Sequence, residues 1–276
     1  MLRSLYSGIS GMRGFQLKLD VIGNNIANVN TVGFKASRVM FRDILSQTIA
    51  GASGPTDQGV GGVNAKQVGL GSTIAAIDTL HTQGSAMTTN VATDLRIDGD
   101  GFFAVAPSQD AEQRYLTRAG NFTVDAAGFL VNPEGMYVLD EGGDPINITG
   151  LGITAFTIAP DGQIIGVGAD GVQTATGVYI GVVTVTNPGG LEKIGGNLYR
   201  LTPNASTETD VTALIGRAAD PERGSGAIVS GQLEMSNVDL TNEFTEMIVA
   251  QRGFQANSRI ITTSDSILEE IVNLKR

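Results

Sequence analysis

Apolar residues at the start of the chain recur every three or four positions. This spacing places them on one face of a helix, so the sequence predicts an amphipathic α-helix at the N-terminus. Four glycines interrupt it, and each costs about 1 kcal/mol relative to alanine. We therefore expect this helix to be weak alone and to need a partner. The apolar positions are Leu2, Leu5, Ile9, Met12, Phe15, Leu19, Ile22, Ile26 and Val29, and the glycines are Gly8, Gly11, Gly14 and Gly23.

The other end of the chain carries a seven-residue repeat of large apolar side chains. From residue 236 onward there is no Pro and one Gly, so the repeat predicts a long second helix whose apolar stripe is buried against partner helices. Asn237 or Asp239 can cap its start. A neighbouring stripe is apolar only at its two ends, which suits a wall of several helices better than a dry dimer. A helix docked on its own domain is the simpler alternative. The repeat is Leu240, Met247, Phe254, Ile261 and Leu268, and the neighbouring stripe is Phe244, Gln251, Ser258, Asp265 and Val272.

Between the two helices, short runs of Val, Ile, Thr and Phe alternate with Gly, Asp, Asn and Pro. This texture indicates β-strands joined by turns. One pattern occurs twice, as FTVDAAGFL at 122–130 and FTIAPDGQI at 156–164, and predicts two similar hairpins. Residues 46–64 are small, polar and rich in glycine, which indicates a surface loop or a flexible connection.

These patterns predict an α+β fold. The N- and C-terminal helices are expected to pair as a coiled-coil-like inner domain, and the middle of the chain to form a mainly β domain. The predicted boundaries are 1–35 for the first helix, 36–69 for an extended linker, 70–231 for the β-rich domain and 232–276 for the second helix.

Charge narrows the range of partners. The net charge is −10, which disfavours nucleic acid, because nucleic-acid binding depends on clustered Lys and Arg. Residues 1–45 carry six basic and two acidic side chains, whereas residues 232–276 carry seven acidic and four basic ones, so the two ends are complementary. There is no cysteine and no apolar run long enough for a membrane span, and we expect export, if it occurs, without a cleaved signal peptide.

The residues that catalysis, metal binding or nucleotide binding would require are missing or misplaced. His81 is the only histidine and reads most simply as a strand end entering a turn. Asp98 and Asp100 resemble the start of a calcium loop, but Phe102 and Gln109 stand where later ligands belong. Gly69 and Gly71 lack the third glycine of a dinucleotide site. We therefore expect no catalytic, cofactor-binding or metal-binding residues and no enzyme.

Two long motifs resemble those of the bacterial flagellar rod and hook protein family. The first is LDVIGNNIANVNTVGFK at 19–35, and the second is SNVDLTNEFTEMIVAQR at 236–252, followed by VNLKR at the end. The middle adds HTQG at 81–84, IDGDGFF at 97–103 and TRAGNF at 117–122, so the resemblance spans nearly the whole chain. Its motif positions include Asn24, Asn25, Asn28, Gly33, Phe34, Asn237, Gln251 and Arg252. The asparagines also have a local reading, since Asn favours turns and helix ends.

The resemblance implies a structural subunit of the flagellum in which the two end helices line a tube. The expected assembly residues are Leu5, Ile9, Met12, Leu19, Ile22 and Ile26 of the first helix, with Leu240, Met247, Phe254, Ile261 and Leu268 of the second. The implied partners are further copies of the chain, the rod, hook-cap and hook–filament junction proteins, and the flagellar type III export apparatus. A short hook protein is our first reading and a distal rod protein the alternative. The rival class, a secreted β-domain that binds a ligand, would favour an aromatic groove, but the chain has no Trp.

Overall fold

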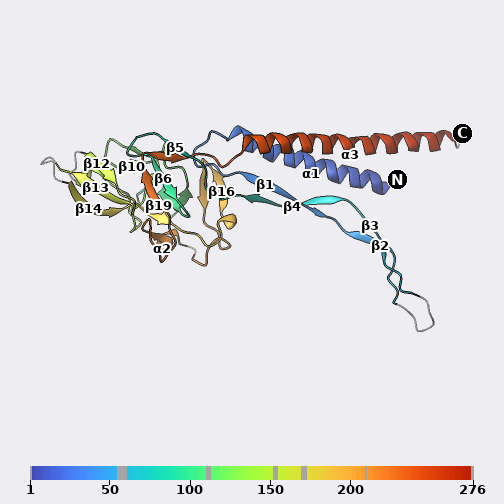
Figure 1. Ribbon diagram of the computed structural model, residues 1–276, viewed down its shortest axis with the longest axis horizontal. Helices are drawn as coiled ribbons and strands as arrows, with labels where there is room; N and C mark the ends of the chain where they lie inside the picture. The colour runs from blue at the N-terminus through green and yellow to red at the C-terminus, as the bar shows by residue number, and fades with distance from the viewer. Residues whose placement is uncertain are drawn as a thin grey trace. The chain divides into compact units, whose positions relative to one another are not determined.

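The computed structural model describes residues 2–54, 61–109, 113–151, 155–168, 173–208 and 210–274. Residues 55–60 of the predicted linker and residues 275 and 276 of the predicted second helix lie outside the described residues. The chain forms two compact units (Figure 1). Unit 1 takes the two ends of the chain and residues 37–79, and unit 2 takes residues 28–36 and 80–238.

Unit 1 consists of two long helices and two pairs of antiparallel strands. The helices are α1 (Leu2–Ala27) and α3 (Leu240–Leu274), and the strands are β1 (Ser37–Asp43), β2 (Ser46–Ala50), β3 (Lys66–Gly69) and β4 (Ser72–Thr79). Strand β1 pairs with β4, with an irregularity between Met40 and Phe41, and β2 pairs with β3. The stretch 36–69, for which we expected an extended linker, therefore contributes three strands. No local sequence pattern indicates this pairing, because the residues that pair with β1 lie in β4, beyond the intervening glycine-rich segment.

Local signals explain where the two helices begin and end. Helix α1 ends at Ala27, and the Thr31 backbone N–H donates to the Asn28 carbonyl in the turn that follows. Of the two expected caps of α3, Asp239 fills the role, because its carboxylate accepts a hydrogen bond of 2.9 Å from the Thr241 backbone N–H. Asn237 serves unit 2 instead.

Unit 2 is almost entirely β-structure, and its described strand pairs are antiparallel. A nine-stranded sheet has the order β16-β17-β8-β7-β11-β10-β9, with β15 joining β7 to β18, and smaller sheets are β12-β13-β14, β19-β6 and β20-β5. The elements are β5 (Ala86–Thr88), β6 (Leu95–Asp98), β7 (Phe102–Ala106), β8 (Tyr115–Thr117), β9 (Thr123–Val124), β10 (Leu130–Val131), β11 (Tyr137–Val138), η1 (Thr149–Leu151), β12 (Ala155–Ile158), β13 (Gln163–Val167), β14 (Gln173–Tyr179), β15 (Val182–Val183), η2 (Pro188–Gly190), β16 (Glu192–Gly195), β17 (Leu198–Arg200), α2 (Val211–Leu214), β18 (Ile215–Gly216), β19 (Ala227–Ser230) and β20 (Gln232–Glu234).

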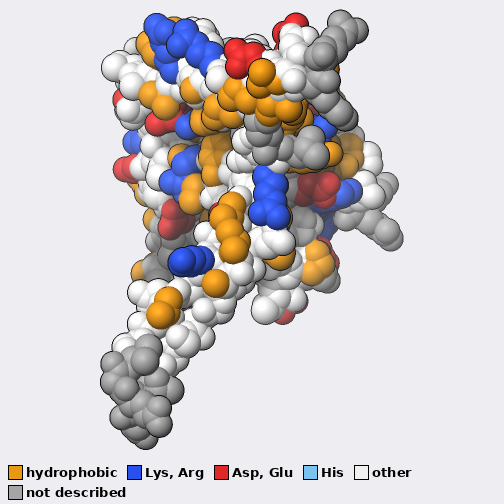
Figure 2. Space-filling view, turned by 90° about the vertical axis from the view of Figure 1, so that its right-hand side faces the viewer, with side chains coloured by type: hydrophobic (Ala, Val, Ile, Leu, Met, Phe, Trp, Pro, Cys, Tyr) orange, Lys and Arg blue, Asp and Glu red, His pale blue; other side chains and the backbone are white. Residues whose placement is uncertain are grey.

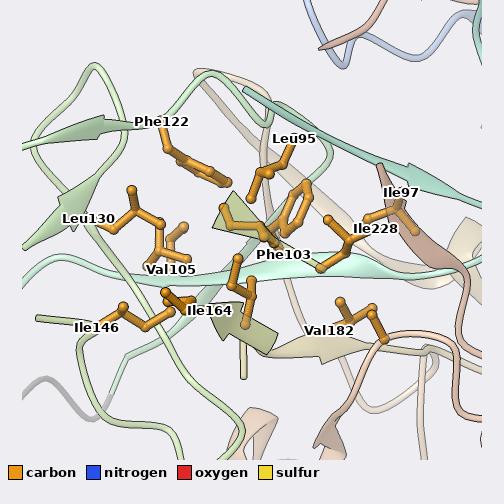
Figure 3. Close-up of a cluster of buried hydrophobic side chains, with 14 of the residues drawn as sticks. Leu95, Ile97, Phe103, Val105, Phe122, Leu130, Ile146, Ile164, Val182 and Ile228 are labelled. Carbon is orange, nitrogen blue, oxygen red and sulfur yellow. The ribbon is translucent and has the colours of Figure 1, made fainter. Parts of the chain in front are cut away.

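Strand β7 organises the core of unit 2. All five of its residues are buried, as its continuous apolar sequence FFAVA indicates. Phe103 and Val105 join one cluster of buried side chains (Figure 3), whereas Phe102 and Ala104 join a second. Because successive side chains of a strand point to opposite faces, β7 is covered on both sides.

The repeated sequence pattern does form two similar hairpins. Strand β9 pairs with β10 through a turn at Gly128, and β12 pairs with β13 through a turn at Gly162. In both turns the glycine N–H donates to the carbonyl three residues earlier, and its φ is positive, +89° and +83°. Only glycine adopts this backbone conformation freely. The expected class, a helix at each end and a mainly β middle, is confirmed.

Candidate assembly site

In unit 1, α1 and α3 approach closely because glycines of each helix face larger side chains of the other across the contact, which we call the helix seam. A Cβ added at Gly11 would lie 2.8 Å from the side-chain nitrogen of Asn257, and one added at Gly253 would lie 2.6 Å from the Phe15 ring. Side chains larger than hydrogen would therefore push the helices apart. Gly8 likewise faces Ile261.

Another glycine of α1 provides room for strand β1. A Cβ added at Gly14 would lie 2.7 Å from the ring of Phe41, which packs 5.6 Å, centroid to centroid, from Phe15. Sequence reasoning treated these glycines only as a weakness of the helix. The spacing of Gly8 and Gly11, three residues apart, was the signal that they share a face of the helix and form a contact.

Polar groups fix the other end of the helix seam. Lys18 of α1 and Glu246 of α3 form an ion pair. The buried side chain of Asn25 accepts from the Ser37 backbone N–H at 3.0 Å, donates to the Ser37 carbonyl at 2.8 Å, and donates to the Glu243 carboxylate at 3.1 Å. Asn25 therefore joins α1, β1 and α3 through one amide group.

The expected assembly residues are distributed over buried and exposed positions. In α1, Ile22 is buried, Ile9 is exposed, and Leu5, Met12, Leu19 and Ile26 are half-buried. In α3, Met247, Ile261 and Leu268 are half-buried, whereas Leu240 and Phe254 are exposed. Within a single chain, the heptad stripe is thus only partly covered, and its complete burial stays a prediction.

Large apolar side chains face solvent on every element of unit 1. Figure 2, which looks toward the free ends of α1 and α3, shows hydrophobic side chains gathered on this face beside acidic and basic ones. The exposed apolar residues of the unit include Tyr6, Leu17, Leu45, Ile49, Phe244, Ile248, Val249, Ile260, Ile267, Ile271, Val272 and Leu274. Apolar surface of this extent on a folded unit is typical of a surface that binds another protein.

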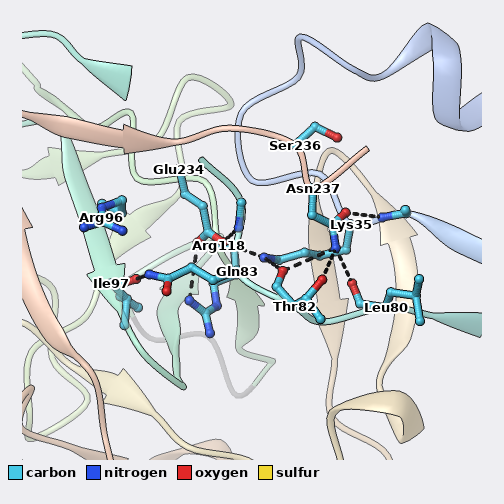
Figure 4. Close-up of polar contacts among 12 residues, drawn as sticks. Lys35, Leu80, Thr82, Gln83, Arg96, Ile97, Arg118, Glu234, Ser236 and Asn237 are labelled. Carbon is cyan, nitrogen blue, oxygen red and sulfur yellow. Dashed lines mark hydrogen bonds and ion pairs between the residues drawn. The ribbon is translucent and has the colours of Figure 1, made fainter. Parts of the chain in front are cut away.

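Unit 2 contains a buried ion cluster formed by Lys35, Arg118 and Glu234 (Figure 4). The Glu234 carboxylate accepts from Lys35 at 2.5 Å, from Arg118 at 3.3 Å, and from the backbone N–H of Gly84 at 3.0 Å. Burial lowers the pKa of Lys35, and the adjacent Glu234 carboxylate opposes that change. No local sequence pattern indicates this cluster, because Lys35 and Glu234 are 199 positions apart.

Asn237 ties three segments of unit 2 together beside this cluster. Its side-chain oxygen accepts from the Ala36 backbone N–H at 2.8 Å, and its amide nitrogen donates to the Leu80 carbonyl at 2.8 Å and to the Thr82 hydroxyl at 2.9 Å. One side chain thereby connects segments from the start, the first third and the end of the chain.

The positions singled out for metal or catalytic chemistry have structural surroundings. His81 packs against the rings of Phe102 and Tyr199, with centroids 5.7 and 5.5 Å away. Burial, with the positive charges of nearby Lys and Arg side chains, lowers its pKa to about 4. Asp98 pairs with Arg96 at 3.4 Å. Among the residues that the structure describes, no group of three or more His, Asp or Glu could hold a metal ion.

Three family models match successive parts of the chain. They are described as flagella basal body rod protein, matching residues 5–35, flagellar hook protein FlgE/F/G D1 domain, matching 96–166, and flagellar basal body rod FlgEFG protein C-terminal, matching 229–274. The flagellar basal-body rod protein FlgG of Bacillus subtilis is 55% identical over the full length of both chains. The chain belongs to the flagellar rod and hook protein family.

Two further members of the rod and hook family place the chain within it. The rod protein FlgG of Borreliella burgdorferi is 36% identical over 283 aligned positions, and the hook protein FlgE of the same bacterium is 30% identical over 454, each over the full length of both chains. Over the full length of the chains, the identity to each of these two rod proteins is thus higher than the identity to this hook protein, whose alignment is much longer. These comparisons favour the rod alternative over our first reading, the hook.

Family membership makes the chain a structural protein of the flagellum and not an enzyme. For the same reason we set aside the rival hypothesis of a secreted β-domain that binds a ligand. Among the described residues, no helix has both the length and the hydropathy that crossing a bilayer requires.

The family-motif residues have different structural roles in the two units. In unit 2, Gly33 has a φ of +70° and leaves no room for a Cβ, which would lie 2.5 Å from the Ala119 nitrogen. Phe34 is buried, with the Lys193 ammonium 3.9 Å from its ring centroid. Asn28 is half-buried and accepts from the Thr31 hydroxyl at 3.1 Å. The exposed motif residues are Asn24 of α1 and Gln251 and Arg252 of α3.

Proposed function

We propose that this protein is a structural subunit of the flagellar basal-body rod, in its distal part, and that it polymerises helically with further copies of itself. The observation that carries the proposal is the exposed apolar surface of α1, α3 and the β2–β3 hairpin, which the chain does not cover itself. The 55% full-length identity to a basal-body rod protein supports the rod as the place of assembly. Contacts between different faces of identical subunits generate an open filament when the rotation from one subunit to the next does not close a ring.

We further propose which parts of the chain form the inner and the outer domain of the assembled tube. The helices of the ends, predicted over 1–35 and 232–276, form a coiled-coil-like inner domain that lines the tube, and residues 70–231 form the outer domain. The partly exposed heptad stripe of α3 supports this division, because a neighbouring subunit is needed to cover residues such as Leu240 and Phe254. The strands of residues 37–79 belong to the same compact unit as the helices and share their exposed apolar character.

The proposal includes partners beyond the homopolymer. We expect other axial proteins of the rod and hook at the two ends of the assembly, and the flagellar type III apparatus as the route of export. Family membership supports both expectations.

Electron microscopy of basal bodies from a strain that lacks the gene tests the proposal. We expect a rod that stops short of its full length and carries no hook, and restoration of both when the gene is supplied again. A complete rod that lacks only the hook would instead identify the protein as a hook subunit. A normal rod and hook would exclude both roles.

A further inference from the structure

The end of α3 extends beyond the start of α1 (Figure 1). Gly8 faces Ile261, so α1 continues for six residues past this level to Leu2, whereas α3 continues for 13 to Leu274. At 1.5 Å per residue, the difference leaves about 10 Å of α3 without a neighbour from α1. We call residues 269–274 the α3 overhang.

Half of the overhang consists of large apolar side chains. Ile271, Val272 and Leu274 are 51%, 65% and 86% exposed. They do not share one narrow face, because positions 271 and 272 are about 100° apart around a helix. A two-turn helical end with this surface is unfavourable in water, so the overhang requires a partner that surrounds it on more than one side.

A groove of about 540 Å³ lies elsewhere on unit 1, between α1, the first residues of β4, and the residues next to the ends of β1 and β4. Its apolar lining includes Tyr6, Ile9, Leu17, Ile44, Leu70 and Ile74. Arg13 is its one charged lining residue. We call this feature the α1 groove; it combines an apolar surface with a positive charge.

We propose that the α3 overhang of one copy docks in the α1 groove of the next copy. This inference rests on the proposed function, self-assembly, and names the surfaces that meet. Apolar lining matches apolar overhang, and the Arg13 charge is complementary to Glu269 and Glu270 of the overhang and to Asp265 before it. Among the described residues, these four form no ion pair within the chain.

Docking of this kind can only occur between copies. Phe15 contacts Gly253, and Ile271 lies 18 residues further along α3, about 27 Å away. The groove residue Leu17 lies still further from Ile271 along the antiparallel pair. Each copy therefore offers a free overhang and a free groove, so the contact can repeat from copy to copy, and it gives an open filament when the rotation between copies does not close a ring.

Disulfide trapping tests this contact, because the natural chain has no cysteine. The double variant Leu17→Cys/Ile271→Cys cannot close a disulfide within one chain, since that bond requires Cα atoms within about 7 Å. We expect mild oxidation of assembled rods to give a ladder of dimers, trimers and longer species on non-reducing gels. Each single variant should give no species beyond a dimer.

The matched comparison is Leu17→Cys/Ile49→Cys, which places the second cysteine on strand β2. A ladder from this pair and none from Leu17/Ile271 would show that the β2–β3 hairpin fills the groove and would overturn the proposal. Absence of any ladder from assembled rods would overturn it as well. Rod formation and motility are measured on the same variants before oxidation, so a failed contact is distinguished from a failed rod function.

Should Leu17→Cys prevent assembly, Ile9→Cys takes its place, because Ile271 lies ten residues, about 15 Å, beyond the level of Gly8. Charge reversal gives an independent measurement. Arg13→Glu should lower the rate of assembly about ten-fold or more, and combining it with Glu269→Arg and Glu270→Arg should restore it. Failure of the triple variant to recover, with Arg13→Glu impaired, would count against the pairing.

Discussion

Replacing Glu234 by glutamine tests whether the buried ion cluster holds unit 2 together. The substitution keeps the size of the side chain and removes its charge. Lys35 and Arg118 would then remain as two buried cations, with side chains only 0% and 4% exposed and no carboxylate between them. Removing one partner of a buried ion pair costs about 3–5 kcal/mol, because the remaining charge is left without compensation.

The expected loss can be measured on the purified protein. For a unit of this size, 1 kcal/mol corresponds to about 2–4 °C in melting temperature, so we expect a decrease on the order of 10 °C in the transition that unfolds the β-structure. Far-ultraviolet circular dichroism, which follows the β-structure, would measure this transition. In a denaturant titration, the free energy of unfolding should fall while its slope against denaturant concentration stays unchanged.

The matched control is Glu192→Gln, which removes the exposed ion pair between Glu192 and Arg200. Exposed pairs contribute about 0–1 kcal/mol, so this variant should melt within a few degrees of the natural protein. If Glu234→Gln melts no lower than Glu192→Gln, the buried ion cluster does not stabilise unit 2 and our account of it is wrong.

Three further predictions concern the helices and the single histidine. Phe254→Asp should leave the melting temperature of unit 2 unchanged and block rod assembly, because it puts a carboxylate on the heptad stripe of unit 1. Thr263→Asp is the milder comparison, and normal rods from Phe254→Asp would contradict the stripe. Gly253→Val should destabilise unit 1 by about 1–3 kcal/mol, because the added side chain displaces the Phe15 ring. Hydrogen exchange of the α1 backbone amides should become faster. Unchanged protection of these amides would contradict the close helix seam. The folded-state pKa of His81 is about 4, below its ordinary 6.5, so the stability it contributes is complete above pH 6.5 and is lost as pH falls toward 4. The loss amounts to about 3 kcal/mol. His81→Phe should remove this part of the acid destabilisation, and an identical pH profile in both proteins would refute it.

The sequence was informative wherever structure follows from neighbouring residues. Apolar spacing predicted both end helices, and the repeated FTxxxxG pattern predicted two hairpins, because a helix face and a tight turn each depend on a few consecutive side chains. The start of α3 was also readable, since the Asp239 cap acts only two residues away.

Long-range pairings could not be read in the same way. Strand β1 pairs with β4, and Lys35 pairs with Glu234, across distances in sequence that no local pattern encodes. The choice between hook and rod could not be made from the motifs for a related reason. The end motifs are shared across the family, so they carry little information about which member a chain is, whereas full-length identity does.

The distribution of residue sizes in unit 1 separates the contact within the chain from the contacts proposed between chains. At the helix seam, Gly8, Gly11 and Gly253 each leave room for a larger side chain of the other helix, and Ala250 is fully buried. Large apolar side chains such as Phe244 and Ile248 point outward. A helix pair that buries all of its large apolar side chains in the mutual contact leaves little apolar surface for a neighbour. By using glycine where the helices touch, the chain keeps its large apolar residues for other subunits, and the stability of unit 1 should therefore rise on assembly while that of unit 2 should not.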